Sequence, residues 1–300
     1  MTNYSPALSV IITSVRALDR VPAWVGELMK QNRDRPVEII LAGSHSDESL
    51  KVMAADHPEV IFIPFPPMTP LPRLLGAAVS RSTGEIITIT DMTCEIDRNW
   101  ISEVMKAHEK PSPVIGGAVE PKGLKGLVEW TAYFCDYGQF MLPLKEGIVN
   151  EVPGNNLSFK RGAMARGRKF LEGEFWKTYW CRQIQAEGFT LYSVPTIVVF
   201  YRRSFHLGGY LVHRFHNGRC FAGMRIPQLS RILHILYLVG SPLLSILICV
   251  RILRAVIPKG RYLGRLFACF PIIIFAALSW ALGEFVGYLS GTGTSCRYVR

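Results

Sequence analysis

Residues 83–93 read Thr-Gly-Glu-Ile-Ile-Thr-Ile-Thr-Asp-Met-Thr, and their pattern predicts the architecture of the first half of the chain. The centre of the stretch, residues 86–90, is rich in β-branched side chains, as expected for a strand that is buried on both faces. Apolar residues recur at helical spacing before it, at 71–79, and a second helical segment follows at 99–108. This alternation is typical of an α/β fold, in which helices cover a parallel sheet on both faces.

The same alternation extends to both sides of this strand. Further strands are expected at residues 8–13, 37–41, 60–64, 114–119, 157–160 and 190–200, and further helices at 21–29, 47–56 and 175–187. Residues 153–156 read Pro-Gly-Asn-Asn, which is a turn signal before a strand. Residues 127–141 are rich in aromatic side chains, which either guide a lipid or, as is more usual for such a stripe, pack in the core.

Two long apolar stretches lie near the C-terminus, at residues 232–250 and 266–289. Each reaches the roughly 20 residues that cross a hydrocarbon core. We therefore divide the chain into a main domain, 1–225, and a membrane-associated helical tail, 226–300. A helical hairpin would place the basic linker between the stretches outside, against the usual excess of cations on the cytoplasmic side. Gly240-Ser241-Pro242 leaves open the alternative of a re-entrant or in-plane pair of half-helices.

The net charge of +11 indicates an anionic partner. Many of the basic residues flank the apolar tail, and anionic membrane lipids explain this placement better than nucleic acid does. The chain has neither an aromatic-rich RNA-binding signature nor a helix-turn-helix pattern. The sequence therefore predicts contact with membrane lipids and no nucleic acid. A homo-oligomer is compatible with the sequence.

The seven cysteines are odd in number and form no Cys-x-x-Cys pair. This pattern argues against a disulfide framework or a zinc site, and for a reducing compartment. The apolar run at residues 7–13 is too short for a signal peptide, and charged residues follow it closely. We therefore expect a protein of the cell membrane whose main domain is cytoplasmic.

Asp91 directly follows the strand at residues 86–90, and parallel α/β sheets bind ligands at the carboxyl ends of their strands. A carboxylate at this place can hold a divalent cation, and the cation can neutralise a diphosphate leaving group. The alternative interpretation of Asp91 is a turn or helix N-cap aspartate.

The order and spacing of several motifs resemble the family-2 inverting glycosyltransferases of the GT-A fold. The resemblance rests on Leu71-Pro-Arg-Leu-Leu-Gly-Ala-Ala, on residues 83–93, on Trp100, on Leu8-Ser-Val-Ile-Ile-Thr and on Gly154-Asn-Asn. It covers residues 8–225 and implies a GT-A-like, mainly parallel sheet flanked by helices. It also implies a nucleotide-sugar donor, a Mg²⁺ or Mn²⁺ cofactor and transfer with inversion. Because C-terminal membrane segments are common in lipid-directed members, the resemblance implies a lipid-linked acceptor at the cytoplasmic membrane face.

The resemblance further implies a set of site residues. Asp91 would hold the metal and act in catalysis, Thr13 and Asp47 would line the nucleotide pocket, Arg73, Arg214 and Arg219 would contact phosphate, and Asn155, Asn156 and Glu174 would face the acceptor. Alternatives are open for the three arginines. Arg73 would otherwise pair with an acid on its own helix, and Arg214 and Arg219 would otherwise contact lipid headgroups. His213 and His216 lack a third ligand, so a metal role is not expected for them.

The chain departs from the family pattern at five places. The first strand ends in Thr13-Ser-Val-Arg where the family has Pro-Thr-Tyr-Asn, and only Asp47 is left of the Gly-Ser-x-Asp element. The metal motif Asp91-Met-Thr lacks its second carboxylate, and Ala42 stands where the family carries an aspartate. Trp176-Lys177 occupies the position of the family's Glu-Asp pair, so Glu174 or Glu172 is the nearest candidate base. An ionised phosphate acceptor needs such a base much less, which favours a polyprenyl-phosphate acceptor.

A non-catalytic membrane scaffold that retains the fold is the alternative function, because the metal and base motifs are degenerate. A dinucleotide-dependent oxidoreductase is not favoured, since no Gly-x-Gly-x-x-Gly motif follows the first strand.

Glu284 is the only charged residue in the stretch 266–289. A charge within a membrane is costly and by default has a partner or a function. In an antiparallel hairpin that turns near Pro258, residue 284 lies at the depth of residue 232. We therefore expect an ion pair with Arg231 or His234, and snorkelling to the interface is the alternative.

Overall fold

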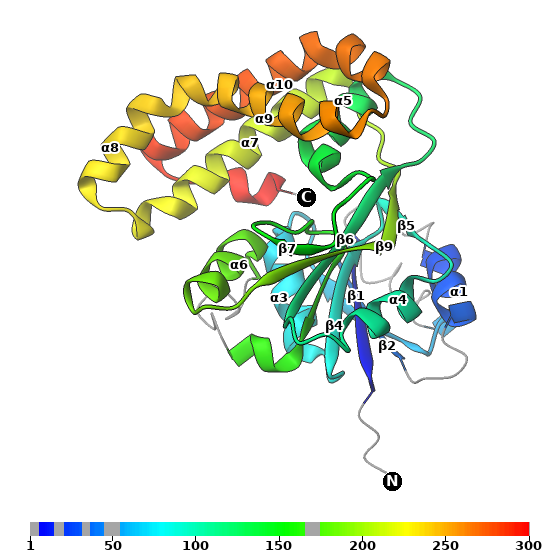
Figure 1. Ribbon diagram of the computed structural model, residues 1–300. Helices are drawn as coiled ribbons and strands as arrows, with labels where there is room; N and C mark the ends of the chain where they lie inside the picture. The colour runs from blue at the N-terminus through cyan, green and yellow to red at the C-terminus, as the bar shows by residue number, and fades with distance from the viewer. Residues whose placement is uncertain (1–5, 15–20, 32–36, 45–54, 166–174, 300) are drawn as a thin grey trace. The chain divides into compact units, whose positions relative to one another are not determined.

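A computed structural model of the chain describes residues 6–14, 21–31, 37–44, 55–165 and 175–299 (Figure 1). The chain forms two compact units that do not follow chain order. The first, here the sheet unit, comprises residues 1–122 and 142–202, and the second, here the helical unit, comprises 123–141 and 203–300. The predicted division at residue 225 stays a prediction, although the helical unit takes in residues on both sides of it.

The sheet unit contains a mixed sheet of nine strands within the described residues. The strand order is β3-β2-β1-β4-β8-β6-β9-β5, and β7 pairs with β9. The strands span Leu8–Ser14 (β1), Val37–Ser44 (β2), Val60–Phe65 (β3), Ile86–Asp91 (β4), Cys94–Ile96 (β5), Val114–Pro121 (β6), Gly147–Val149 (β7), Leu157–Lys160 (β8) and Leu191–Tyr201 (β9).

The first four strands of the chain form the parallel half of this sheet, because β1 pairs in parallel with both β2 and β4, and β2 with β3. The next pairings, β4 with β8 and β8 with β6, are antiparallel. Strands β5 and β7 were not expected from the sequence, since three residues are too few for a periodic pattern. The segment 190–200 forms one continuous strand in spite of Pro195, and β6 meets it with a register shift between Gly116 and Ala118.

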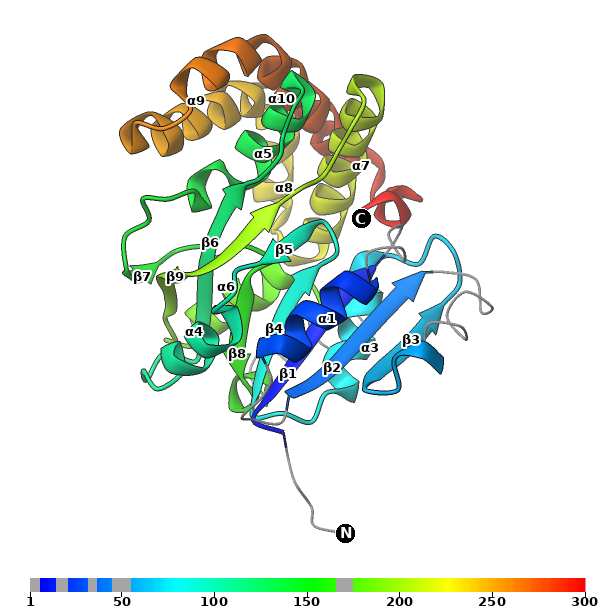
Figure 2. The same ribbon diagram turned by 90° about the vertical axis from the view of Figure 1, so that its right-hand side faces the viewer.

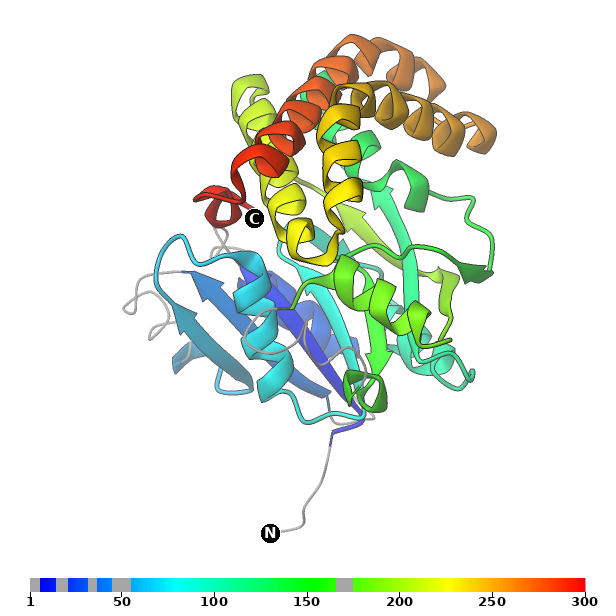
Figure 3. The same cartoon turned by 90° about the vertical axis from the view of Figure 1, so that its left-hand side faces the viewer.

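Helices cover both faces of the sheet, as predicted. They span Val21–Gln31 (α1), Leu71–Arg81 (α3), Trp100–Ala107 (α4) and Lys177–Ala186 (α6). Helices α1 and α4 lie on one face (Figure 2), and α3 and α6 lie on the other (Figure 3). The core between α3, α6 and the strands contains Leu74, Ile87, Phe159 and Trp180, all fully buried. The helix predicted at 47–56 lies mostly outside the described residues.

The helical unit contains five α-helices among its described residues. They span Leu127–Tyr137 (α5), Leu207–Arg225 (α7), Arg231–Gly240 (α8), Leu244–Val256 (α9) and Leu263–Ser290 (α10). A 3₁₀ turn, Ser241–Leu243, separates α8 from α9 at the predicted break. Helices α7 and α10 approach backbone to backbone, because a Cβ atom added at Gly283 would lie 2.1 Å from the carbonyl oxygen of Phe215.

Two segments of the helical unit are long and apolar enough to cross a membrane, judged by length and composition. They are Arg231–Lys259 and Leu263–Ser290, in which 17% and 39% of the most apolar window is buried. They run antiparallel, since Nε2 of His234 lies 2.8 Å from the carbonyl oxygen of Tyr288. This contact supports the predicted hairpin arrangement of the two segments within the unit.

Glu284 is buried inside the helical unit, with 6% of its surface exposed. Its Oε1 accepts a hydrogen bond of 2.7 Å from Nε1 of Trp280. The burial contradicts the snorkelling alternative, which needs a carboxylate at the surface. The ion pair with Arg231 or His234 stays a prediction.

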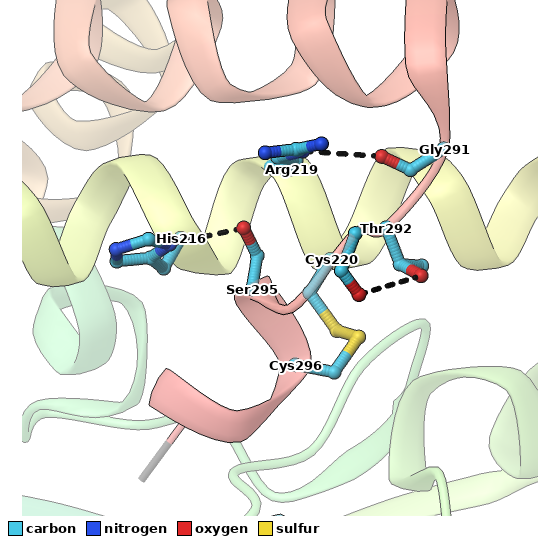
Figure 4. Close-up of a disulfide and its surroundings, with 8 residues drawn as sticks. His216, Arg219, Cys220, Gly291, Thr292, Ser295 and Cys296 are labelled. Carbon is cyan, nitrogen blue, oxygen red and sulfur yellow. Dashed lines mark hydrogen bonds between the residues drawn. A yellow bond between two sulfur atoms is a disulfide. The ribbon is translucent and has the colours of Figure 1, made fainter.

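A disulfide joins Cys220 of α7 to Cys296, which follows α10 (Figure 4). Close to it, Nδ1 of His216 lies 2.9 Å from Oγ of Ser295. The prediction that the cysteines form no disulfide is wrong for this pair. The two residues are 76 positions apart, so the spacing along the chain carried no sign of the pairing. The argument from cysteine spacing for a reducing compartment therefore does not hold.

Candidate functional site

The carboxyl ends of β1 and β4 bring two predicted site residues together. Thr13 and Asp91 are register partners in the parallel pairing of these strands. The amide of Met92 donates to the carbonyl oxygen of Thr13 at 3.2 Å, which extends the contact beyond the strand ends. Thr13 is buried, and Asp91 is half-buried. This edge of the sheet is where open α/β folds bind ligands.

The carboxylate of Asp91 is held in one orientation by Thr93. Its Oδ1 accepts a hydrogen bond of 2.7 Å from the Thr93 amide and a second from the Thr93 hydroxyl. This is the geometry of an aspartate that stabilises its own turn. Asp91 therefore does stabilise a turn, as the alternative interpretation expects. An oriented carboxylate at a ligand-binding edge is also what a cation site requires.

Contacts from other segments of the sheet unit hold the residues that follow Asp91 in place. The amide of Arg202 donates to the carbonyl oxygen of Thr93 at 2.8 Å, and Nε1 of Trp24 donates to the carbonyl oxygen of Cys94 at 2.8 Å. Glu95 pairs with Lys122 and Arg202. Partial burial of Glu95 opposes ionisation, but the hydrogen bonds from these two cations lower the pKa of its carboxyl overall. The site therefore rests on a rigid support.

The residues around Asp91 suit a cation that is bound largely by substrate. In the described part of the chain, no group of three His, Cys, Asp or Glu side chains could hold a metal ion. The hydroxyl of Thr93 stands where a second carboxylate would be expected. Mg²⁺ is often bound by only one or two carboxylates together with substrate phosphates. Asp91 fits this arrangement, and it does not fit an all-protein cage.

The side chain of Asn156 forms hydrogen bonds that hold the sheet unit together. Its Oδ1 accepts from Nε1 of Trp100 at 2.9 Å, and its Nδ2 donates to the carbonyl oxygens of Ala118 (2.8 Å) and Ile197 (2.9 Å). These bonds connect α4, β6 and β9. Both amide hydrogens are committed and the side chain is buried, so little capacity is left for the predicted acceptor contact.

Asn155 differs from its neighbour in having a spare acceptor. Its Nδ2 donates to Sγ of Cys94 at 3.0 Å, and the side chain is 3% exposed. Its Oδ1 is buried and has no hydrogen-bond partner among the described residues. An unsatisfied buried oxygen costs about 1–3 kcal/mol unless a ligand or water donates to it. Asn155 is therefore the better candidate of the two for contact with a substrate.

Arg73 lies on α3 with its side chain exposed. The alternative of an acid partner on its own helix fails, because α3 carries no acidic residue. Asp47, Glu172 and Glu174 lie outside the described residues. Lys177, at the position expected for the base, donates to the carbonyl oxygen of Val152 at 2.8 Å, which places a cation beside the Gly154-Asn-Asn turn. The sequence did not indicate this contact, because no spacing pattern predicts a hydrogen bond from a lysine to a distant backbone carbonyl.

Arg214 and Arg219 belong to the helical unit. Arg214 is 3% exposed, forms a 2.8 Å ion pair with Asp136 and lies over the ring of Trp280 at 4.3 Å. Arg219 donates through Nε to the carbonyl oxygen of Gly291 at 3.2 Å (Figure 4). Both side chains are engaged inside their own unit. This placement favours a structural role over the predicted phosphate contact.

The mixed sheet, its flanking helices and the carboxylate after β4 define a GT-A-like α/β protein. The family model described as glycosyl transferase family 2 matches residues 9–173, so the chain belongs to this family. A comparison with curated proteins gives no match.

Solved structures agree on the fold. The mannosyltransferase PcManGT from Pyrobaculum calidifontis, in complex with GDP-Man and Mn²⁺, aligns over 99% of this chain and 86% of its own, with a TM-score of 0.51 and 15% identity. TarS 1–349 from S. aureus, in complex with UDP-GlcNAc, has a TM-score of 0.50 and 11% identity over 66% of this chain and 59% of its own. GalNAc-T7 with UDP, GalNAc and Mn²⁺ has a TM-score of 0.51 and 12% identity over 68% and 45%. Identities this low support the fold alone.

Proposed function

We propose that the protein transfers a sugar, with inversion, from a nucleotide-sugar donor to a lipid-linked acceptor at the cytoplasmic membrane face. The observation that carries this proposal is the oriented carboxylate of Asp91, in register with Thr13, at the ligand-binding edge of a glycosyl transferase family 2 fold. The solved structures with GDP-Man and Mn²⁺, and with UDP, GalNAc and Mn²⁺, support a nucleotide-sugar donor and a divalent cation.

Each described residue has a defined task in this proposal. Asp91 holds Mg²⁺ or Mn²⁺, and the bound cation would supply charge neutralisation to the leaving diphosphate. Thr13 lines the nucleotide pocket, and the exposed guanidinium of Arg73 contacts phosphate. Asn155 accepts a hydrogen bond from the acceptor through its unpaired Oδ1.

The acceptor decides whether a base is needed. A hydroxyl acceptor must lose a proton as the sugar is transferred, and Glu174 is the residue we assign to remove it. A phosphate acceptor, such as polyprenyl phosphate, is already ionised. If the acceptor is a hydroxyl, Glu174→Gln lowers turnover by about 10²–10⁴-fold with donor affinity unchanged. Near-normal turnover in this variant, measured with each acceptor type, assigns the phosphate acceptor instead.

The lipid-linked acceptor is supported by the surface of the helical unit. Large apolar side chains of the two candidate spans are exposed, among them Ile232 (73%) and Val239 (72%). A soluble protein buries most of a helix of this composition, and contiguous apolar surface marks an interaction site. The cytoplasmic face is the part of the proposal that the disulfide challenges, because disulfides are rare there. Protease accessibility of the sheet unit in sealed, oriented vesicles tests it directly.

Nucleotide binding distinguishes an enzyme from a non-catalytic scaffold. We expect at least one nucleotide-sugar in a panel to raise the melting temperature in the presence of Mn²⁺, because ligand binding stabilises by mass action. Asp91→Asn removes the metal-dependent part of this shift. Asp97→Asn is the matched control, since it changes a half-buried acid of the same unit that bonds the amide of Asn99. A scaffold shows no metal-dependent shift in any of the three proteins.

A further inference from the structure

A small hollow in the helical unit lies between the end of α5 and helix α9. Its cavity volume is about 10 Å³, which is roughly the space of one water molecule. Phe134, Ile252 and Ala255 give it apolar walls, and Asp136 and Arg251 give it charged ones. Gly138 lies in the same wall, where a Cβ atom would approach Val256 to 2.9 Å, so α9 is seated firmly against this segment.

The charges around the hollow do not balance. The carboxylate of Asp136 forms a 2.8 Å ion pair with Arg214, and the guanidinium groups of Arg203 and Arg251 also act on it. Three cations therefore share one carboxylate. In addition, Nε of Arg214 is buried without a hydrogen-bond partner among the described residues. Arg251 is the one of these three cations that lines the hollow, and the positive charge around Asp136 favours an anion beside it.

Arg251 is the cation of this group that is open to a ligand. It lies within the candidate span Arg231–Lys259, its side chain is exposed, and no described residue forms a hydrogen bond or ion pair with it. A charged side chain in a membrane segment is costly and by default has a partner or function. The side chains around Arg251 on α9 indicate the chemical class of that partner.

Apolar side chains and a charged side chain follow one another along the surface of α9 near Arg251. Leu247 precedes Arg251 on α9 by four residues, which places both on one face, and Leu243 ends the 3₁₀ turn that leads into the helix. Both leucines are 62% exposed. The surface thus presents two apolar side chains and then a guanidinium beside a hollow. An amphiphile with a hydrocarbon chain and an anionic head matches this order.

We propose that the exposed Arg251, which lines the hollow beside Asp136, binds the phosphate of a membrane lipid at the surface of α9, and that the hydrocarbon chain of the lipid lies along Leu247 and Leu243. A guanidinium binds phosphate through two parallel hydrogen bonds, which a lysine cannot reproduce. The excess positive charge next to Asp136 holds the second charge of a phosphate monoester. The site is independent of sugar transfer, because it lies entirely in the helical unit and requires no donor.

The test measures binding to the full chain in neutral detergent, without donor or metal. The probes are dihexanoyl phosphatidic acid, inorganic phosphate and dihexanoyl phosphatidylcholine, titrated by calorimetry. We expect the phosphatidic acid to bind at least about 10-fold more tightly than either other probe, because only it offers both the anionic head and the chain. Binding of inorganic phosphate with equal affinity would show an anion site without a lipid site, and would overturn the proposal.

Two matched variants separate a specific site from general charge. Arg251→Gln should weaken phosphatidic acid binding at least about 10-fold, the loss of one charge-assisted contact. Arg254→Gln removes the same charge from the same helix, away from the hollow lining, and should change affinity less than about 2-fold. Arg251→Lys, which keeps the charge, should give an intermediate loss and serves if the glutamine variant does not fold. Equal losses in the Arg251→Gln and Arg254→Gln proteins, or no loss in either variant of Arg251, would refute the site.

Discussion

The sheet unit and the helical unit are stabilised by different interactions. In the sheet unit, β1 is bonded to β2 and β4 along its length, and branched aliphatic side chains fill the core. In the helical unit, α8 buries no residue. Helices α7 and α10 are held by backbone contact at glycines and by the cation–π contact of Arg214 with Trp280, and a disulfide joins α7 to the segment after α10. The difference teaches that one unit follows from local periodicity, while the other depends on a few contacts between distant residues.

The disulfide carries the largest expected effect. Cys220→Ser should lower the stability of the helical unit by about 4 kcal/mol, the loop-closure value for residues 76 apart. Cys249→Ser is the control, because Cys249 is a free thiol. Thermal unfolding in nanodiscs measures both. If reduction and Cys220→Ser leave the melting temperature unchanged, the contacts of α7 and α10 alone hold the unit.

The adjacent asparagines sharpen the description of the sheet unit. Asn156→Ala leaves the indole of Trp100 and two backbone carbonyl oxygens without their hydrogen-bond partner, and should lower the free energy of unfolding by about 3 kcal/mol. Asn155→Ala removes one bond to Cys94 and should cost about 1 kcal/mol, while lowering turnover. Denaturant unfolding and a transfer assay separate the two effects. Equal stability losses would contradict the different tasks given to the two residues.

Close helix contact in the helical unit is tested by two glycines of α10. Gly283→Ala should destabilise by about 2 kcal/mol, because the added Cβ meets the backbone of α7. At Gly264 nothing lies within 4 Å of an added Cβ, so Gly264→Ala should stabilise by up to about 1 kcal/mol through helix propensity. The same sign for both substitutions, in thermal melts, would contradict backbone contact between α7 and α10.

The smallest expected effect is a pH dependence in the sheet unit. His108 is buried, with Nε2 2.9 Å from Oγ of Ser158, and burial followed by the charge of Lys160 lowers its pKa to about 4. The unfolded chain, with a histidine pKa of about 6.5, binds the proton more readily in this window. Stability should therefore fall between pH 6.5 and 4, by on the order of 1–2 kcal/mol at pH 5. His108→Gln should flatten this slope, and an unchanged slope would exclude His108 as its origin.

The parallel half of the sheet and its ligand-binding edge could be predicted from the sequence, because β-branched runs and helical spacing are local signals. Asp91 and the turn at residues 153–156 followed from such local signals, whereas Thr13 followed from the family resemblance. The separate tasks of Asn155 and Asn156 could not, since they depend on Trp100 and Ile197, which lie far along the chain. The disulfide was missed for the same physical reason.

The central claim is that the edge of the sheet at Asp91 supports nucleotide-sugar-dependent transfer, and one assay tests it most directly. Protein in nanodiscs with Mn²⁺, membrane lipid extract and labelled nucleotide-sugars is assayed for label in the lipid phase. We predict transfer from at least one donor, reduced at least about 100-fold by Asp91→Asn, since charge neutralisation by the cation contributes several kcal/mol, and retained by Asp97→Asn. Absence of transfer from every donor, or equal transfer by the Asp91→Asn protein, would contradict the claim.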